Sequence, residues 1–500
     1  MDKKKLAGYV EMTFQGVEDF NRLQFDLYKN MDLEKVEWQG KMLDFERRHD
    51  AVFVDFPEMI QQGTESMIKI SYAGKPRKAI MPPWDGGFVW KRDKENRPWI
   101  GVACEGDGAS LWWPNKDHLS DEPESMDIKV TVPKDLTCVA NGNLIDVSKK
   151  KTKKTFHWRV SYPINNYNVT VNIAHYKNFK DVYTSFDGQE LELDYYVLDY
   201  NLDKAKEHFK QVGKCLEAFE FYFDKYPFWN DGFALVETSY LGMEHQGAIA
   251  YGNKYMRGYL GGMIPFHMDW DYIIVHETGH EYWGNSISMN DMAEMWIHES
   301  FTTYMEALYV EYNYSYKEAV DYLGMQKPYI ENRKPIIGPR DVNFQDFGSS
   351  DHYYKGSWVL HTLRNVLGND ELWFDILKSF YREHSITNID TKDFINYFNI
   401  KAGEDYNYFF DQYLYKASPP LLLYQIERQG NDIVVSFKWD EETGDFPMNI
   451  EMGNPILYKK VSPTTEVQSV VFKGLSPNDF QVAEEKYLLK TSPLKLAKRK

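Results

Sequence analysis

The apolar residues of this chain change their spacing twice, and this change constrains the fold more than any other feature of the sequence. Up to about residue 200, apolar and polar residues alternate, as in Val10–Phe14 and Met67–Tyr72, which is typical of strands with one buried face. The spacing is then helical, with one long helix expected over Asn201–Tyr226 and helical patterns dominating 269–415, before alternation returns after Pro420. The sequence therefore predicts a multidomain α+β protein. Its expected domains are a β-rich 1–200, a mostly helical 201–418 and a small β-type 419–500 with a basic tail.

Composition narrows the classes of protein to which the chain can belong. Of its 500 residues 43% are hydrophobic, and 75 Asp and Glu against 58 Lys and Arg give a net charge of −17. This length suggests about three domains, and a nucleic-acid-binding protein would be expected to show a basic face instead. No run of about 18 apolar residues occurs, so we expect no membrane-spanning helix. The three cysteines are widely spaced, which argues against a disulfide framework and against a zinc–cysteine site.

The first residues leave the cellular compartment open. Met1–Lys5 is charged and no apolar stretch follows it, so the sequence predicts a soluble protein without a secretory signal in this chain. Because strand-like alternation begins almost at once, at Leu6, the chain can start inside a domain. An extracytoplasmic location is therefore as compatible with the sequence as an intracellular one.

One short segment carries the residue types of a metal site. In His276–His280 (His-Glu-Thr-Gly-His) the histidines are four residues apart, so on a helix both imidazoles lie on one face and reach a single ion. Zinc suits them, because catalytic zinc takes three protein ligands and keeps one position for water. Glu277 falls beside that water and can accept its proton. With 13 histidines and 75 carboxylates in the chain, chance would produce about 0.05 such matches, and a third ligand is still needed.

These residues resemble the zinc signature of the aminopeptidase N family of zinc metallopeptidases, gluzincins that include the leukotriene hydrolases. The family's third zinc ligand corresponds to Glu299, which follows His280 after a gap of eighteen residues, and Trp283–Asn285 and Trp296–Tyr304 are similar to the flanking segments. Demanding a carboxylate at position 299 lowers the chance expectation to about 0.008. The resemblance extends to about residue 416. It implies a saddle-like β-rich N-terminal domain, a thermolysin-like catalytic domain, one zinc ion per chain and no large C-terminal helical domain.

The resemblance also assigns residues that would bind the free amine of a substrate. Leu241–His245 is similar to the family's Gly-Ala-Met-Glu-Asn loop, with different residues at its first and last positions. It makes Gly242, Met243 and Glu244 substrate-binding residues. A protonated amine taken from water needs a carboxylate partner, whereas apart from the zinc motif Glu244 would be read as an ordinary loop acid. Whether His245 contacts substrate or packs behind the loop stays open.

Two further segments are similar to family motifs. Cys104–Pro114 resembles the segment that contributes a Gln or Glu to the amine site, here Glu105, although the residues after Asp107 differ from the family's; the alternative is an acid in a glycine-rich turn. Asp351–Ser357 resembles the family's Tyr-x-Lys-Gly and makes Tyr353 the catalytic phenol, with the next tyrosine as its competitor. A phenol with a pKa of about 10 stays protonated and can donate to a developing oxyanion.

The resemblance thus implies a zinc aminopeptidase that removes residues from peptides with a free N-terminus, using Glu277 as general base and acid. Three alternatives are weighed against it. An endopeptidase results if Glu244 does not bind an amine. Relatives that hydrolyse epoxides carry another tyrosine five residues before the catalytic one, where this chain has Gly348. A silent zinc-containing peptide-binding protein would be expected to lack a ligand, the base or the phenol, and all five residues are present. Side-chain preference, oligomeric state and the role of 419–500 are not predicted.

Overall fold

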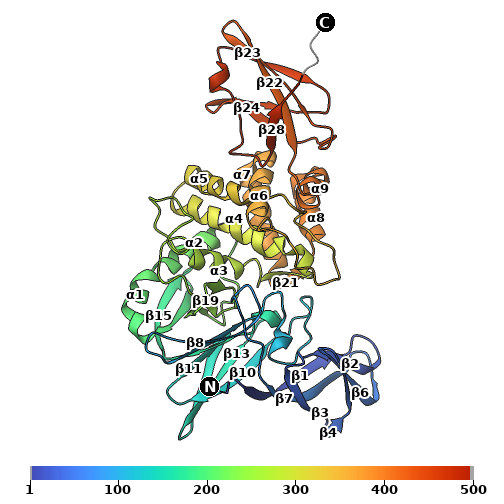
Figure 1. Ribbon diagram of the computed structural model, residues 1–500, viewed down its shortest axis with the longest axis vertical. Helices are drawn as coiled ribbons and strands as arrows, with labels where there is room; N and C mark the ends of the chain where they lie inside the picture. The colour runs from blue at the N-terminus through green and yellow to red at the C-terminus, as the bar shows by residue number, and fades with distance from the viewer. Residues whose placement is uncertain (1–2, 496–500) are drawn as a thin grey trace. The chain divides into compact units, whose positions relative to one another are not determined.

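The computed structural model describes residues 3–495 and is drawn in Figure 1. The chain forms two compact units, each assembled from several stretches of sequence. The first contains Met1–Leu216, Tyr226–Gly262 and Trp270–Glu281, and the second contains Glu217–Lys225, Met263–Asp269 and Tyr282–Lys500. Within the described part of the chain, no helix has the length and apolar character needed to cross a membrane.

The alternating sequence at the start of the first unit folds into two small antiparallel sheets. In the first sheet, β1 (Leu6–Gln15) runs against β7 (Glu65–Gly74), with Val10 opposite Ile70. The strand orders are β1–β7–β3 (Met31–Trp38)–β4 (Lys41–Leu43) and β2 (Phe20–Asp26)–β6 (Ala51–Ile60)–β5 (Phe45–Arg48). One apolar cluster joins their buried faces: Phe25, Val36, Trp38, Val52, Val54, Ile68 and Ile70. Period-two patterning therefore produces the β structure that the sequence predicts.

Two more sheets follow in the first unit. Their orders are β11 (Thr137–Ala140)–β14 (Val171–Ala174)–β9 (Pro98–Ala103)–β8 (Gly87–Arg92) and β10 (Met126–Pro133)–β13 (Lys153–Val160)–β12 (Asn143–Lys149). Two short 3-10 helices, η1 (Ala109–Leu111) and η2 (Asn166–Asn168), lie between strands. Residues 149–154, five of which are lysines, form the tip of the β12–β13 hairpin. The turn is closed by the Lys150 N–H, which donates to the Lys153 carbonyl at 2.9 Å.

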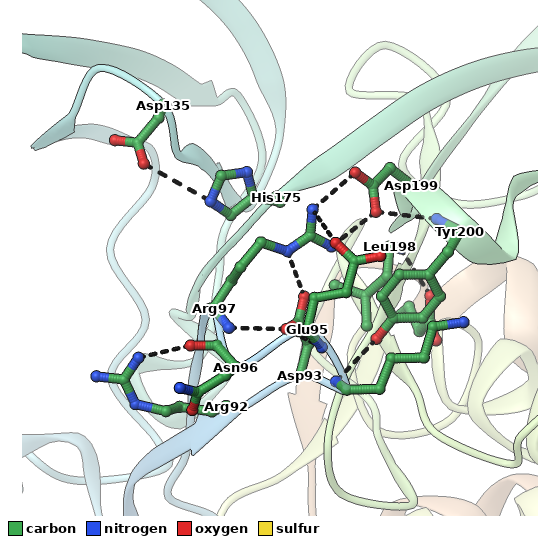
Figure 2. Close-up of polar contacts among 12 residues, drawn as sticks. Arg92, Asp93, Glu95, Asn96, Arg97, Asp135, His175, Leu198, Asp199 and Tyr200 are labelled. Carbon is green, nitrogen blue, oxygen red and sulfur yellow. Dashed lines mark hydrogen bonds and ion pairs between the residues drawn. The ribbon is translucent and has the colours of Figure 1, made fainter.

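A half-buried arginine, Arg97, ties the β8–β9 hairpin to the short segment that leads into the first α-helix, as Figure 2 shows. Arg97 donates two parallel bonds to Asp199, at 2.7 and 2.8 Å, and a third to Asp93 at 2.8 Å. Bidentate guanidinium–carboxylate pairs are among the strongest polar contacts in proteins, and this one lowers the pKa of Asp199. The pair joins sequence-distant parts of the first unit where β structure changes to helix.

A mixed five-stranded sheet then carries the helices of the first unit. Its order is β15 (Tyr176–Thr184)–β16 (Glu190–Leu198)–β17 (Phe233–Glu237)–β19 (Ile249–Tyr251)–β18 (Gly242–Met243). The helices along this stretch are η3 (Asp199–Asn201), α1 (Leu202–His208), α2 (Gln211–Tyr222), whose residues from Glu217 onward belong to the second unit, and α3 (Tyr272–His280). Because β18 is the edge strand and α3 contacts both β18 and β19, this topology places the Gly-Met-Glu segment beside the His-Glu-x-x-His helix.

The second unit begins with helices. They are α4 (Trp296–Asn313), α5 (Tyr316–Gln326), α6 (Tyr354–Leu367), α7 (Asp370–His384), α8 (Thr391–Ala402) and α9 (Asn407–Leu414), with η4 (Met292–Glu294) and η5 (Lys327–Tyr329). β20 (Ile287–Met289) pairs in parallel with β21 (Thr387–Ile389). Side chains cap the first turn of two of these helices: the Asn369 side chain accepts from Leu372 N–H at 3.1 Å at the start of α7, and Asp390 and Asp393 form a capping box at the start of α8.

The second unit ends in two small sheets. Their orders are β26 (Gln468–Phe472)–β23 (Asp432–Trp439)–β22 (Leu421–Gln429)–β28 (Lys490–Pro493) and β25 (Leu457–Val461)–β24 (Ile450–Asn454)–β27 (Gln481–Val482), with η6 (Pro477–Asp479). Buried hydrogen bonds join this part to the helices. Leu488 N–H donates to Thr362 at 2.9 Å, and the Tyr413 hydroxyl donates to the Leu488 carbonyl at 2.7 Å.

The α+β class is confirmed, and one helix prediction is wrong. The single helix expected over 201–226 is broken at Phe209, where α1 has ended and α2 has not yet begun. The Phe209 ring is buried and packs against Tyr195, Tyr251 and Tyr255. The apolar pattern predicts one continuous helix, but the tertiary packing of the Phe209 ring favours a break at this residue. The two compact units do not coincide with the three predicted segments, and the three-domain division stays a prediction.

Candidate active site

Helix α3 is held at its first turn by one buried carboxylate. Asp271, the N-cap, accepts from the Ile273 and Ile274 N–H groups through Oδ1. Its Oδ2 accepts the Tyr251 hydroxyl at 2.7 Å and lies 2.7 Å from His208 Nε2. An acceptor at this position satisfies amides that have no partner within the helix and favours the positive helix end. The helix that carries the histidines is therefore fixed to its own sheet.

The two histidines meet as the spacing predicts. His276 and His280 are buried, and their Nε2 atoms lie 3.1 Å apart. Two nitrogens bound tetrahedrally to one zinc ion at about 2.0–2.1 Å would be about 3.3 Å apart. The third predicted ligand, Glu299, is buried in the first turn of α4, in the second unit. This donor set fits zinc, and the role of the three residues as its ligands stays a prediction.

Glu277 lies against β18, and the contact explains the glycine there. A Cβ on Gly242 would be 2.3 Å from Glu277 Oε1 and 3.0 Å from Ile273 Cγ2. Any larger residue would displace the carboxylate that is predicted to act as general base. Met243, the next residue of the strand, is buried and belongs to the apolar core of the first unit.

Glu244 places a second carboxylate beside Glu277. One ligand atom each of Glu244, Glu277 and His280 lies within 4.8 Å of the others. Glu244 is buried, and its Oε1 accepts the Tyr167 hydroxyl at 3.0 Å. This hydrogen bond orients the carboxylate, and Tyr167 comes from the N-terminal β-rich part of the chain.

Glu105 lies close to Glu244, with carboxylate oxygens within 4.8 Å of each other. Its turn is fixed by Asp107, which accepts the Gly86 N–H at 2.6 Å and pairs with Arg77. Two carboxylates this close would both be stabilised by one shared cation, since like charges otherwise repel. The first unit thus brings together the two residues assigned to the amine.

Tyr353 is the N-cap residue of α6. The Ser300 hydroxyl, next to Glu299 on α4, donates to the His352 carbonyl at 2.7 Å and so fixes the start of α6 against α4. A Cβ on Gly356 would be only 1.7 Å from that hydroxyl, so the two helices cross in close contact. Burial lowers the pKa of His352 to about 4, which keeps the ring beside Tyr353 neutral.

Comparison with known proteins identifies the family. Residues 200–413 match the Peptidase family M1 domain, and the match includes His276, His280 and Glu299. This part of the chain is an M1, or aminopeptidase N, family domain. Its relatives include aminopeptidase N of Lactococcus lactis subsp. lactis, 27% identical over 42% of this chain and 26% of that protein. Probable aminopeptidase 2 of Sulfurisphaera tokodaii is 20% identical over 78% of this chain and 49% of that protein. The chain thus spans about a quarter to a half of the length of these relatives.

Solved M1 structures share the fold. A two-domain M1 zinc metallopeptidase bound to L-tryptophan superimposes with a TM-score of 0.71, at 18% identity over 83% of this chain and 91% of that one. The M1 zinc metallopeptidase of Deinococcus radiodurans gives a TM-score of 0.69 at 17% identity, with the same coverage. The predicted fold class, a β-rich N-terminal part followed by a mostly helical part, is therefore confirmed.

His245, in the place of the family's Asn, is neutral. It has no exposed surface, and burial lowers its pKa to about 3. A neutral ring adds no positive charge next to Glu244, the residue that is predicted to bind the substrate amine. Whether the ring contacts substrate stays open.

Sequence reasoning did not single out Tyr167 or Ser300. Tyr167 is 77 residues from Glu244 in the chain, and Ser300 is 52 residues from His352. A tyrosine among 36 and a serine within a helix carry no local pattern that would predict these contacts. The only signal available was the position of Ser300 next to the predicted ligand Glu299.

Proposed function

We propose that this M1 peptidase is a zinc-dependent aminopeptidase with one zinc ion per chain, acting on peptides with a free N-terminus. The observation that carries the proposal is the placement of Glu244 beside Glu277 and His280, with ligand atoms within 4.8 Å. An amine-binding carboxylate at this distance from the general base limits which peptide bond is reached.

The distances support removal of a single residue. In a peptide the α-nitrogen is about 2.5 Å from its own carbonyl carbon, and an ammonium–carboxylate bond adds about 2.8 Å. The carbonyl of the first residue therefore lies within about 5 Å of Glu244, where Glu277 is found. The next carbonyl along an extended chain is about 3.5 Å further away. Glu105, close to Glu244, would share the positive charge of the amine.

The residues divide the chemistry among them. Zinc held by His276, His280 and Glu299 would act as a Lewis acid and increase the acidity of water. Glu277 would accept the proton of the attacking water and later deliver it to the departing amine. The Tyr353 hydroxyl would donate a hydrogen bond to the oxyanion that develops at the scissile carbonyl.

The test compares two fluorogenic substrates, an aminoacyl amide with a free amine and its N-acetylated twin, with and without a chelator. We expect release from the free amine only, loss of release with the chelator, and recovery on adding zinc. Glu277→Gln keeps the shape of the side chain but removes the base, so the rate should fall by at least about 10²-fold. Glu237→Gln, the same change at a buried glutamate that binds Leu198 N–H, is the matched control and should keep its activity.

Each contrary result would refute a different part of the proposal. Equal cleavage of both substrates would refute the amine-binding role of Glu244 and indicate an endopeptidase. No release from a broad panel of free-amine substrates, with zinc bound stoichiometrically, would indicate a peptide-binding protein without turnover. Full activity of Glu277→Gln would refute the assignment of the general base.

A further inference from the structure

Glu281 directly follows His280 and continues the helical turn at the end of α3, with its side chain completely buried. Its two carboxylate oxygens point to different partners. Oε1 accepts the backbone N–H of Gly247 at 3.0 Å, and Oε2 accepts the Tyr226 hydroxyl at 2.8 Å. A buried carboxylate is tolerated where hydrogen bonds replace its hydration. One of these bonds goes to the loop that carries Glu244.

This loop, Glu244–Ala248, joins β18 to β19 and is called here the amine loop. Hydrogen bonds to several parts of the first unit hold it. Tyr167 binds the carboxylate at its start, Asn141 donates to the Gln246 carbonyl at 2.8 Å, and the Gln246 amide donates to the Pro163 carbonyl at 3.0 Å. A further contact, from Glu281 to Gly247, comes from the end of α3.

Successive turns at the end of α3 contact two places: the strand β18, which leads into the amine loop, and the loop itself. Glu277 touches Gly242, and Glu281 binds Gly247, which has a φ of +63°. Residues four apart on a helix lie on one face about 6 Å apart along its axis. A rigid helix with contacts at two points fixes both the distance and the tilt of the amine loop.

We propose that Glu281 is a positioning residue that sets the amine loop at the distance from Glu277 that one amino-acid residue spans. The inference rests on the proposed aminopeptidase function, because it concerns the placement of the amine-binding carboxylate. Without the bond to Gly247, the loop loses its connection to the end of α3, and a substrate amine held by Glu244 no longer presents its own carbonyl to Glu277.

The geometry also predicts which substitution restores the function. In Glu281→Gln the amide oxygen can accept the Gly247 N–H. The amide N–H can donate to the Tyr226 oxygen, whose own proton has the Gly232 carbonyl at 3.2 Å as an acceptor. Glu281→Leu has a similar volume and offers no acceptor to Gly247. The negative charge is therefore dispensable and the acceptor is not.

The experiment measures binding to the zinc-loaded full chain by calorimetry with two probes. Leucine hydroxamate carries a free α-amine, and 4-methylpentanehydroxamate has the same side chain without the amine. We expect Glu281→Leu to weaken the first probe about tenfold and the second less than twofold, because only the amine contact depends on the loop. Glu281→Gln should restore the first affinity to within about threefold.

Tyr226→Phe is the matched control, since it removes the other partner of the same carboxylate and leaves the Gly247 bond intact. It should lower the melting temperature without changing the ratio of the two affinities. If Glu281→Leu does not fold, Glu281→Asp gives the same comparison, because it keeps the charge and shortens the reach by one methylene.

The outcomes separate the inference from the function on which it rests. If the wild-type protein binds both hydroxamates equally, the amine-binding role of Glu244 fails. If it prefers the amine and Glu281→Leu keeps that preference, the positioning role alone is refuted. Equal weakening of both probes, or no rescue by Glu281→Gln, would also overturn it.

Discussion

Gly242→Ala is the substitution whose effect the structure defines most sharply. Gly242 does not have a positive φ, so alanine adds no backbone strain, and the change acts only through its new methyl group. That methyl would be 2.3 Å from Glu277 Oε1 and 3.0 Å from Ile273 Cγ2. The Glu277 carboxylate is at the end of a flexible side chain and can move away from the methyl group. The substitution should therefore lower the catalytic rate more than the stability of the fold.

The size of the movement predicts the size of the effect. Ordinary contact begins at 3.4 Å, so the Glu277 carboxylate must shift by about 1 Å. A displacement of this size in a catalytic group lowers the rate about 10²-fold, which equals about 2.7 kcal/mol of transition-state stabilisation. Stability should fall by only about 1 kcal/mol, because the helix is not forced to move.

The assay is steady-state hydrolysis of a free-amine aminoacyl amide at pH 7, with zinc content and urea unfolding measured on the same preparation. Gly213→Ala in α2 is the matched control, since a Cβ there meets nothing within 4 Å. It should leave kcat unchanged and raise stability by about 0.5 kcal/mol. If Gly242→Ala with full zinc keeps kcat within about threefold of the wild type, the position of Glu277 does not limit the reaction and the reasoning fails.

Three further predictions concern contacts outside the zinc motif. Tyr167→Phe removes the hydroxyl bound to Glu244 and should raise KM about fivefold through a less oriented carboxylate; an unchanged KM in steady-state kinetics would contradict this role. Burial lowers the pKa of His361 from 6.5 to about 4. The unfolded chain therefore takes up the proton first, and stability should be lost as the pH falls from 6.5 to 4, with urea unfolding of His361→Gln showing a shallower loss. Gly356→Ala would place a methyl 1.7 Å from the Ser300 hydroxyl and should lower the free energy of unfolding by about 3 kcal/mol or more. An unchanged urea unfolding curve would show that α4 and α6 can move apart without loss of stability.

Local patterns predicted the parts of the protein that depend on nearest neighbours in sequence. The period-two segments formed strands, and the spacing of His276 and His280 brought their Nε2 atoms to 3.1 Å. Each of these outcomes needs only the repeat of a strand or a helix. The break at Phe209 was missed because it depends on rings from other strands.

Sequence similarity extended the prediction to the residues around the site, and the tertiary structure supplied the contacts that hold them. Gly242 is a glycine because Glu277 occupies the space where its side chain would lie. Glu244 is oriented by Tyr167, and its loop is held by Glu281 through Gly247. The residues of each pair are far apart in the sequence, at separations that no helix or strand repeat produces. Composition and periodicity therefore could not predict these contacts.

The sequence by itself determined the His-Glu-x-x-His pattern, the order of β-rich and helical parts and the similarity of residues 200–413 to the M1 family, because these follow from short-range spacing and from motifs that many chains share. Only the tertiary structure decided where Glu244 lies relative to Glu277, and which residues keep it there. That distance results from an edge strand, a helix and a loop that pack together across 40 residues of sequence, from Gly242 to Glu281. Packing of this kind is a property of the folded chain, since it requires side chains that meet only after the sheet and the helix have formed.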